Sequence, residues 1–594
     1  MVTFDLIVVF LVLIGILVVL YKELLGTSFT FMVAITIFGV TGILTPSEIL
    51  KGFANEQVAV IIMLLLLGDI IRRTSVIESV FDKLFLSAKS YKGFLSRMVI
   101  IVSAFSSMLN NTPLVAVMMP YVNSWCKRNN FSPSKFLLPL SYAAILGGNI
   151  TLIGTSTNLI VNGLVVEQIE KSPFPGLEKL EIFDFAPVGI AMAIIGFLYL
   201  YFGERLLPKK KSIVDNFNSN TREYLIEAKV RNNSKLIGKT IEESGLRNLK
   251  GLFLVEIIRE SETLAPVSPG TIIEQDDVLI FAGDTEQIAD LIATKSGLSL
   301  PEVGMLTKRK KAEVIEVVVS QNSSIVGKNV RKVNFRSKYD AAIIGVHRNG
   351  ERIPGKIGHV ILKSGDVLLL YTGENFNDLT TNTQDFYLVQ KIKDFVKLEW
   401  YKILALVGGT VLAILLSALN VISLFMGLLI VIMLSLALRI TSPKILPKSI
   451  DYNLGMIIVM SLALGTAMIK SGAAELLANG IINIFIPMGK TGILFGLYFI
   501  STILAAYITN KAAVGIVFPI ALTTAMKLGL NPMPFILIVA YSCAANFMTP
   551  IGYQTNLMVY GPGGYSFKDF FKVGFPLTII YMIVTVLILS AIYF

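Results

Sequence analysis

The sequence is poor in the residues on which metal centres, acid–base enzymes and disulfide-rich proteins depend. Its 594 residues include two cysteines, two histidines and two tryptophans, and only 16% of the chain is charged. Cys126 and Cys543 lie in or beside apolar runs without metal-ligand spacing, so we expect both to be packing residues. The sequence contains no recognisable nucleophile–base pair or metal-ligand cluster and therefore predicts a protein that is not an enzyme and needs no cofactor.

The chain is rich in hydrophobic residues, which form long apolar runs. Hydrophobic residues make up 54% of it and the mean hydropathy is +0.70, which excludes an ordinary soluble protein. Many apolar runs reach the roughly 20 residues that cross about 30 Å of hydrocarbon. The net charge is +11, but Lys and Arg collect at the ends of these runs and in one central segment. This distribution predicts a polytopic α-helical membrane protein, surrounded by lipid and without a nucleic-acid partner.

The composition divides the chain into two membrane halves around a charged insert. The segments are 1–205 (first half), 206–222 (linker), 223–295 and 310–382 (two strand-patterned modules) and 398–594 (second half). Lysines flank the insert at Lys209–Lys211 and again between residues 391 and 397. Because basic residues favour the cytoplasmic side, we expect residues 206–397 in the cytoplasm and both halves in the cytoplasmic membrane.

The insert contains a repeat of its own. Ser234–Lys239 recurs as Ser323–Lys328, and Asp277–Ile280 as Asp366–Leu369, with the same spacing. Each copy predicts an alternating strand, a Gly-Lys turn, a short helix and further strands. The pattern resembles the TrkA-C module of potassium-conductance regulators, which implies an α/β region of two tandem ligand-binding modules. No G-x-G-x-x-G opens a helix here, so NAD is not expected. A regulatory nucleotide and a purely dimer-holding role both remain open.

Each membrane half contains a polar break between two apolar arms. In the first half, Asn110-Asn111-Thr112-Pro113 interrupts the run from Arg97 to Tyr121, and the arms of about 13 to 16 residues are too short to span. In the second half, Thr509-Asn510-Lys511 interrupts the run from Gly492 to Met526. The separation between Asn111 and Asn510 equals that between Pro120 and Pro519, which follow them in the two halves. The sequence therefore predicts two corresponding re-entrant hairpins.

A second pair of breaks follows with nearly the same offset. Gly147–Asn158 and Asn546–Asn556 are both rich in Gly, Asn and Thr and both interrupt apolar stretches, which predicts two broken helices. With the N-terminus outside, the second half repeats the first upside down, although Lys470, Lys490 and Lys527 then fall in outer loops. Inverted repeats with paired broken helices predict a transport site at the membrane midplane.

Broken helices offer two kinds of ligand. A helix start presents unpaired N–H groups and a partial positive charge that suit an anion. Exposed carbonyls and the side-chain oxygens of Asn, Ser and Thr suit Na⁺. The alternative is that these side chains only cap the helix ends. Two matched pairs of breaks favour a shared binding site.

The four breaks resemble the divalent anion/sodium symporter family. Asn110-Asn111-Thr112 and Thr509-Asn510-Lys511 are similar to its paired Ser-Asn-Thr signatures, and Ile153–Asn158 and Pro550–Asn556 to its second pair of site loops. The resemblance implies a homodimeric, elevator-type transporter of sulfate or dicarboxylates. It assigns substrate contacts to Asn111, Thr112, Thr509 and Asn510. We add Lys511, Thr155, Ser156, Tyr553 and Gln554 as further candidate substrate residues. The resemblance places cation sites near Asn110, Asn111 and Gly154 and near Asn510 and Gly552.

Lys511 is the main departure from the family pattern, because it replaces a threonine that would face the substrate. A lysine at a hairpin tip inside the membrane is costly and indicates a functional role. It could pair with a dianion, replace one coupling cation, or carry a coupling proton if burial favours its neutral form. The alternative is a lysine that reaches water from the tip. The fixed charge and the bulk of Tyr553 and Gln554 favour sulfate over a dicarboxylate.

The sequence therefore predicts a cation-coupled secondary transporter of a dianion, with Na⁺ or H⁺ as the coupling ion. A sodium-coupled dicarboxylate symporter, an oxyanion exporter and a ligand-gated channel remain alternatives.

Overall fold

The computed structural model describes residues 3–594 with gaps. The gaps are 23, 74–84, 86–89, 172–173, 211–224, 247–248, 250–251, 260–261, 265–266, 284–296, 300–313, 322, 334, 349–350, 354–356, 373–375, 381–384, 389–398, 444–445, 447–449 and 451. Most of the predicted linker, Lys211 and the basic residues between 391 and 397 lie outside the described residues. A helical body and two small sheets make up the rest.

The first half of the helical body runs from α1 to α10. Its helices are α1 (Phe4–Tyr21), α2 (Thr27–Val40), α3 (Pro46–Lys51), α4 (Glu56–Arg73), α6 (Tyr91–Ser106), α7 (Asn111–Asn129), α8 (Ser134–Gly148), α9 (Ser156–Lys171) and α10 (Ala186–Phe202). The tip between α6 and α7 and the break between α8 and α9 lie where the sequence predicts them.

The second half repeats this order of elements. Its helices are α16 (Trp400–Ile403), α17 (Gly409–Ala418), α18 (Leu424–Ala437), α20 (Tyr452–Lys470), α21 (Ala473–Phe485), α22 (Gly489–Tyr507), α23 (Asn510–Leu528), α24 (Met533–Ala544), α25 (Gln554–Tyr560) and α26 (Phe567–Tyr593). The α22–α23 pair corresponds to α6–α7, and α24–α25 to α8–α9.

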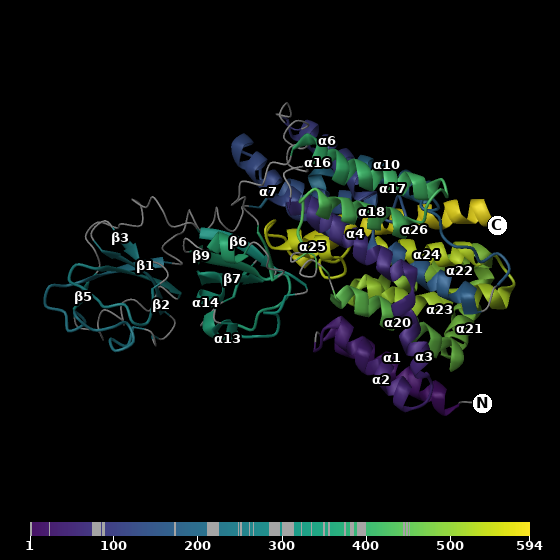
Figure 1. The fold of residues 1–594 in the computed structure, drawn as a ribbon, viewed down its shortest axis with the longest axis horizontal. Helices are drawn as coiled ribbons and strands as arrows, with labels where there is room; N and C mark the ends of the chain where they lie inside the picture. The colour runs from purple at the N-terminus through teal and green to yellow at the C-terminus, as the bar shows by residue number, and fades with distance from the viewer. Residues whose placement is uncertain are drawn as a thin grey trace.

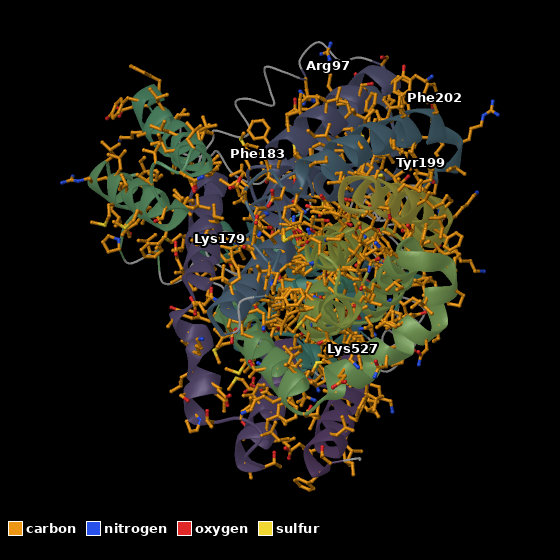
Figure 2. The ribbon with its side chains drawn as sticks, turned by 90° about the vertical axis from the view of Figure 1, so that its right-hand side faces the viewer. Arg97, Lys179, Phe183, Tyr199, Phe202 and Lys527 are labelled. Atoms are coloured by element: carbon orange, nitrogen blue, oxygen red, sulfur yellow. The ribbon has the colours of Figure 1, made fainter. Side chains whose placement is uncertain are left out.

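The helical body has the lengths and the surface of a membrane protein. Six helical segments of the described chain are long and apolar enough to cross a membrane, or seven if one bent pair is counted as a span. Large apolar side chains point outward. Phe183 and Phe202, labelled in Figure 2 on the outside of the body, are 53% and 73% exposed. Lipid covers such a surface at no cost in hydration, which is the expected environment of a multi-pass membrane protein.

The second arm of the first hairpin is longer than the sequence indicated. Helix α6 begins at Tyr91 because Ser90 caps it, its hydroxyl accepting a hydrogen bond from the backbone of Gly93 at 3.2 Å. Helix α7 continues through Pro120 for 19 residues, so the predicted arm length is wrong for this helix. It ends at Asn130, which has a φ of 58°. A helix of this length does not by itself require a re-entrant path.

The insert folds into two five-stranded sheets with the same topology. The first sheet domain contains β1 (Leu225–Val230), β2 (Leu252–Arg259), β3 (Glu262–Leu264), β4 (Val278–Gly283) and β5 (Leu298–Ser299), in the order β3-β2-β4-β1-β5. The second contains β6 (Val314–Val319), β7 (Ala341–Arg348), β8 (Glu351–Arg352), β9 (Val367–Thr372) and β10 (Phe386–Leu388), with short helices α13 (Val330–Val333), α14 (Phe335–Tyr339) and α15 (Phe376–Thr380). Its order, β8-β7-β9-β6-β10, is the same.

Both sheets extend past the predicted module boundaries. Strand β5 lies beyond residue 295 and β10 beyond residue 382, and each pairs antiparallel with the first strand of its own sheet. Two or three residues are too few for a periodicity to be detected, so the sequence pattern did not include these edge strands.

The two sheets lie in line with the helical body (Figure 1). The second sheet domain sits between the first sheet domain and the helices, close to α25, whereas both chain termini lie at the opposite end. Val255 and Ile280 of the first sheet, Leu369 of the second and Val559 of α25 belong to one continuous buried cluster. The second sheet domain is therefore packed against the part of the helical body that contains the second broken helix.

Candidate functional site

A cavity of about 750 Å³ opens where both hairpin tips, both broken-helix loops and the second sheet domain meet. Nine of the residues that the sequence singled out line it, namely Asn110, Thr112, Thr155, Ser156, Thr509, Asn510, Lys511, Tyr553 and Gln554. They come from four segments that are up to 444 positions apart in the chain. The polar breaks of the two halves therefore converge on one space.

Both hairpin tips are helix starts with a side-chain cap. At the first tip, Oδ1 of Asn110 accepts a hydrogen bond from the backbone N–H of Thr112 at 3.3 Å. At the second tip, Oγ1 of Thr509 accepts one from the backbone of Ala512, also at 3.3 Å. Each cap satisfies one of the first N–H groups of its helix and leaves others in the first turn, so both tips bring a partial positive charge to the cavity.

Asn111 lies behind the cavity wall and holds the first tip in place. Its side chain is almost completely buried and contacts the hydroxyl of Ser106. With the amide oriented as its neighbours require, Nδ2 donates to the carbonyls of Ala144 (3.2 Å) and Gly154 (3.1 Å), and Oδ1 accepts from Tyr553 Oη at 2.6 Å. Asn111 thus connects the first tip to both broken-helix loops. In this structure its amide is satisfied by protein groups.

The two broken-helix loops make the same internal hydrogen bonds. In the first loop, Thr151 Oγ1 accepts from the N–H of Gly154 at 3.2 Å, and Asn158 Nδ2 donates to the carbonyl of Thr151 at 3.1 Å. In the second loop, Thr549 takes the place of Thr151, with bonds from Gly552 N–H at 3.2 Å and from Asn556 Nδ2 at 3.1 Å. The two loops therefore have the same local structure.

Each loop is also fastened to its own hairpin in the same way. Thr151 Oγ1 donates to the carbonyl of Ser107 at the end of α6, and Thr549 Oγ1 donates to the carbonyl of Ala506 in α22 at 3.2 Å. Because a buried backbone carbonyl needs a donor, each threonine satisfies a carbonyl at the C-terminal end of the first helix of its hairpin, α6 or α22.

Corresponding residues of the two loops meet in the centre. Thr155 and Tyr553 occupy the same position in the two repeats, and their hydroxyls lie 3.1 Å apart. Next to them, Thr112 Oγ1 donates to Gln554 Oε1 at 3.2 Å. Residues of the second half therefore complete the wall around the first hairpin tip.

The two predicted cation-site glycines lie in tight oxygen-lined positions. A Cβ atom on Gly154 would lie 2.5 Å from the carbonyl oxygen of Gly148 and 2.8 Å from that of Ser106. At Gly552 it would lie 2.8 Å from the carbonyl oxygen of Ala505 and 1.9 Å from Asn546 Nδ2. Each glycine thus lets its loop pack directly against backbone carbonyls, the type of ligand that Na⁺ prefers.

Beside the first loop, Asn158 Oδ1 is a buried oxygen with no hydrogen-bond donor among the described atoms. Asn149, a few residues earlier, is almost completely buried, and its Oδ1 also lacks such a donor. A buried acceptor without a donor is costly unless a cation or water meets it. The oxygens around the first loop therefore fit a small cation.

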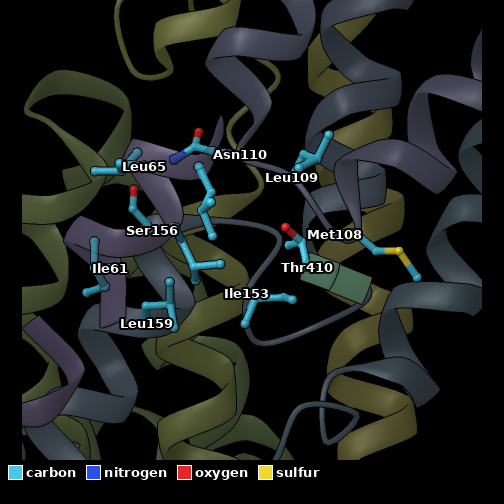
Figure 3. A pocket seen from close by; sticks show the side chains of 11 residues that line it. Ile61, Leu65, Met108, Leu109, Asn110, Ile153, Ser156, Leu159 and Thr410 are labelled. Atoms are coloured by element: carbon cyan, nitrogen blue, oxygen red, sulfur yellow. The ribbon is translucent and has the colours of Figure 1, made fainter. Parts of the chain in front are cut away.

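Asn110 and Ser156 also line a small pocket behind the first tip (Figure 3). The pocket lies between Asn110, Ile61 and Leu65 of α4, and Thr410 of α17. Its volume is about 10 Å³, room for roughly one water-sized particle. Asn110, Ser156 and Thr410 provide the side-chain oxygens in an otherwise apolar lining.

Lys511 lines the large cavity together with an acidic residue that the sequence reasoning missed. Asp69 of α4 lines the same cavity, and only 9% of its surface is exposed. A single carboxylate in the apolar run 58–71 was a usable signal, because ionisable residues inside membrane helices are rare and functional. The sequence reasoning also missed Tyr387 of β10, which lines the cavity from the second sheet domain.

A family model described as citrate transporter matches residues 8–430 and 411–594 of the chain. The chain is 34% identical over 570 residues to a putative sulfur deprivation response regulator of Chlamydomonas reinhardtii, covering 93% of this chain and 96% of that protein. An uncharacterized transporter of Synechocystis is 31% identical over 592 residues, with 97% and 95% covered. Sodium/sulfate cotransporter 1 of C. reinhardtii is 24% identical over 776 residues, with 96% and 88% covered.

Proposed function

The chain belongs to the citrate transporter family CitMHS, and from that premise we propose that it is a cation-coupled secondary transporter of a divalent anion, sulfate. Membership makes it a multi-pass membrane transporter and not an enzyme, as the sequence predicted. The observation that carries the proposal is the convergence of two capped helix starts and Lys511 on one cavity. Helix starts and a lysine are the groups that bind a small dianion in a place where water is scarce.

Sulfate as the substrate rests on charge and on the relatives. Lys511 gives the cavity a fixed positive charge that can pair with a dianion, and Thr112, Thr509 and Asn510 supply donors around it. Several relatives are named sodium/sulfate cotransporters. A second candidate is a di- or tricarboxylate, favoured by the description of the family and by a cavity of about 750 Å³, which has room for a larger anion.

We propose that Na⁺ is the coupling ion, a choice supported by the surroundings of Gly154 and Gly552. The carbonyls beside Gly154 and Gly552 and the buried oxygens of Asn149 and Asn158 would hold a small cation near each loop. In the first half Asn110 and Asn111, and in the second Asn510, complete the proposed sites. Proton coupling through Lys511 is the alternative.

The mechanism we propose is alternating access by an elevator movement in a homodimer. The equivalent hydrogen bonds of the two halves support an inverted repeat around the site. We place residues 206–397 on the cytoplasmic side of the cytoplasmic membrane. The two sheet domains, which we propose to be TrkA-C-like modules, would regulate transport there, with a nucleotide as one candidate ligand.

Uptake into proteoliposomes tests the proposal. Purified protein is reconstituted, and entry of radiolabelled sulfate, succinate and citrate is measured with an inward Na⁺ gradient, with an inward proton gradient and with neither. We expect sulfate uptake that depends on one gradient and is competed by unlabelled sulfate. Carboxylate uptake without sulfate uptake would favour the second candidate, and uptake of none of the three would refute the transport proposal. Currents far above carrier turnover would indicate a channel.

A further inference from the structure

The second sheet domain forms part of the wall of the candidate site. Ser320, Gln321 and Ser323 in the segment after β6, Ser364 before β9, and Tyr387 of β10 line the same cavity as the hairpin tips. On this side, residues of the second sheet domain bound the cavity. A substrate that enters from this side must pass the second sheet domain.

A chain of hydrogen bonds joins the sheet to the proposed substrate residues. Gln554 Nε2 donates to Tyr387 Oη at 2.7 Å, while Gln554 Oε1 accepts from Thr112. Ser320 Oγ also donates to Tyr387 Oη at 3.2 Å. The side chain of Gln554 therefore has one end in the substrate site and the other on the sheet domain.

Strand β10 is held firmly in its own domain. Asp385 directly precedes it and accepts hydrogen bonds from Ser323 Oγ (3.0 Å) and Lys338 Nζ (3.0 Å), and it also bonds Tyr339. Burial by itself raises the pKa of Asp385, but hydrogen bonds from Tyr339 and Lys338 outweigh it and hold the pKa well below its usual value. Tyr387 therefore moves with the second sheet domain as a unit.

The sheet also contacts α25 closely at two glycines. A Cβ atom on Gly365 would lie 2.4 Å from Leu557 Cδ1, and one on Gly561 would lie 1.8 Å from Val367 Cγ2. Real Cβ atoms do not approach neighbours so closely. A side chain at either position would therefore force Leu557 or Val367 to shift, so these glycines allow the close contact between the second sheet domain and the short second broken helix.

The first sheet domain shows that the contact is not a requirement of the fold. At the position of Gly365 it has Asp276, whose φ of 64° is close to the 81° of Gly365, so the turn accepts an aspartate. The counterpart of Tyr387 in the first sheet is Ser299. Each is the second residue of an edge strand, β10 or β5, that pairs with the first strand of its own sheet. Gly365 and Tyr387 are thus specific to the second sheet, whereas Val367 has the equivalent Val278 in the first.

We propose that the second sheet domain is an inhibitory gate that closes the substrate cavity while it is docked on α25, and that it must undock for transport. This gate rests on the proposed transport function. It adds the contact with α25 through which the second sheet domain would control transport. Docking blocks one route to the cavity and ties Gln554 to the sheet. A signal that changes the second sheet domain would reach the site through β10 and the Gly365 turn.

A reversible cross-link tests the gate directly. The ideal Cβ of Gly561 lies 3.3 Å from Val367 Cβ, near the about 3.5–4.5 Å that disulfides need. We therefore design the double variant Gly561→Cys/Val367→Cys. The native Cys126 and Cys543 are fully buried, and the two single-cysteine variants serve as controls. Mass spectrometry measures cross-linking without reference to any substrate.

The gate predicts that oxidation of the double variant lowers sulfate uptake about tenfold or more and that a reductant restores it. The single-cysteine controls should not respond. Full cross-linking with unchanged uptake would overturn the gate. If neither the reduced variant nor the unmodified protein takes up any anion, the transport proposal fails and the gate fails with it. Cross-linking then still reports docking, so the two failures are distinguishable.

A release variant tests the opposite direction. Gly365→Asp places in the second sheet the residue that the first sheet has at this turn, and its side chain would collide with Leu557. We expect uptake to rise about threefold or more, because the docked population falls. The matched control Asp276→Gly changes the same turn in the first sheet and should leave uptake unchanged. If folded Gly365→Asp protein transports more slowly than the unmodified protein, the contact supports transport and the gate is wrong.

Discussion

The two membrane halves agree in the bonds that hold their loops and differ in the side chains that face the cavity. Thr151 and Thr549 make equivalent contacts with a glycine, an asparagine and a hairpin carbonyl. At the tips, however, the neutral Thr112 corresponds to the charged Lys511. The helices after the breaks differ too, since α9 has 16 residues and α25 only seven.

This comparison separates structural from functional constraints. A buried loop inside a membrane protein must satisfy its own backbone, and the same solution serves both halves. The cavity-facing positions are free of that requirement and can diverge. The shorter α25 ends at Gly561, which gives the second sheet domain its place against the helical body. One half thus supplies a neutral tip, and the other supplies the charge and the contact with the insert.

The largest expected effect is at the charged tip. Lys511→Thr makes the second tip as neutral as the first. Because a hydrogen bond to a charged group contributes about 1.5–3 kcal/mol, sulfate uptake at low concentration should fall about ten- to a hundredfold. Initial rates over a sulfate series in proteoliposomes measure it. Lys527→Thr is the control, since this lysine lies at the other end of α23 and pairs with Glu475. Full activity of Lys511→Thr would remove the proposed role of the charge.

The glycines test whether both halves hold a cation. Gly154→Ala and Gly552→Ala each put a methyl group among carbonyl oxygens, so the apparent affinity for the coupling ion should fall about tenfold or more. The Na⁺ dependence of uptake measures it for each variant. Gly480→Ala is the control, because a Cβ there meets nothing within 4 Å. An effect in only one half would show that the two loops are not functionally equivalent.

A smaller effect is expected where the halves touch. Tyr553→Phe removes the hydroxyl that bonds Asn111 and Thr155. At about 1 kcal/mol for a neutral hydrogen bond, the KM for sulfate should rise about fivefold or somewhat more. Thr155→Ser keeps its hydroxyl and should behave like the unmodified protein. An unchanged KM in Tyr553→Phe would mean that the central contact does not shape the site.

The smallest expected effect is a loss of stability that should be similar for equivalent substitutions in the two halves. Thr151→Val and Thr549→Val keep the side-chain volume but remove equivalent hydrogen bonds, and each should lower stability by about 1–3 kcal/mol. Thermal unfolding in detergent should show similar decreases in apparent Tm for the two variants. A large decrease for one and none for the other would contradict the structural equivalence of the loops.

The polar segments that line the cavity could be identified from the sequence because their signals were local. Polar residues inside apolar runs identify the breaks, and nearly the same offset pairs Asn111 with Asn510 and Asn158 with Asn556. All four breaks then meet at one cavity. The reasoning failed where the signal was weak or absent. Asp69 is a single carboxylate in an apolar run, and β10 is too short to be recognised by its pattern.

The position of Asn111 also differed from the expectation of a substrate contact. The sequence identifies it as a polar residue at the tip, but burial decides whether an amide faces a cavity or the protein. In the structure it lies behind Tyr553 and bonds Gly154, so it supports the tip from the protein side. A residue type and a spacing cannot distinguish these two orientations.

The sequence by itself determined the membrane class, the two halves, the inserted repeat and the four polar breaks, because hydropathy and spacing are properties of the local chain. The tertiary structure decided which breaks meet, that Thr155 and Tyr553 touch, and that Tyr387 reaches Gln554 across 167 positions. Such contacts depend on how helices and sheets pack as solid bodies. Packing is a sum of many small contacts that no short stretch of sequence reports.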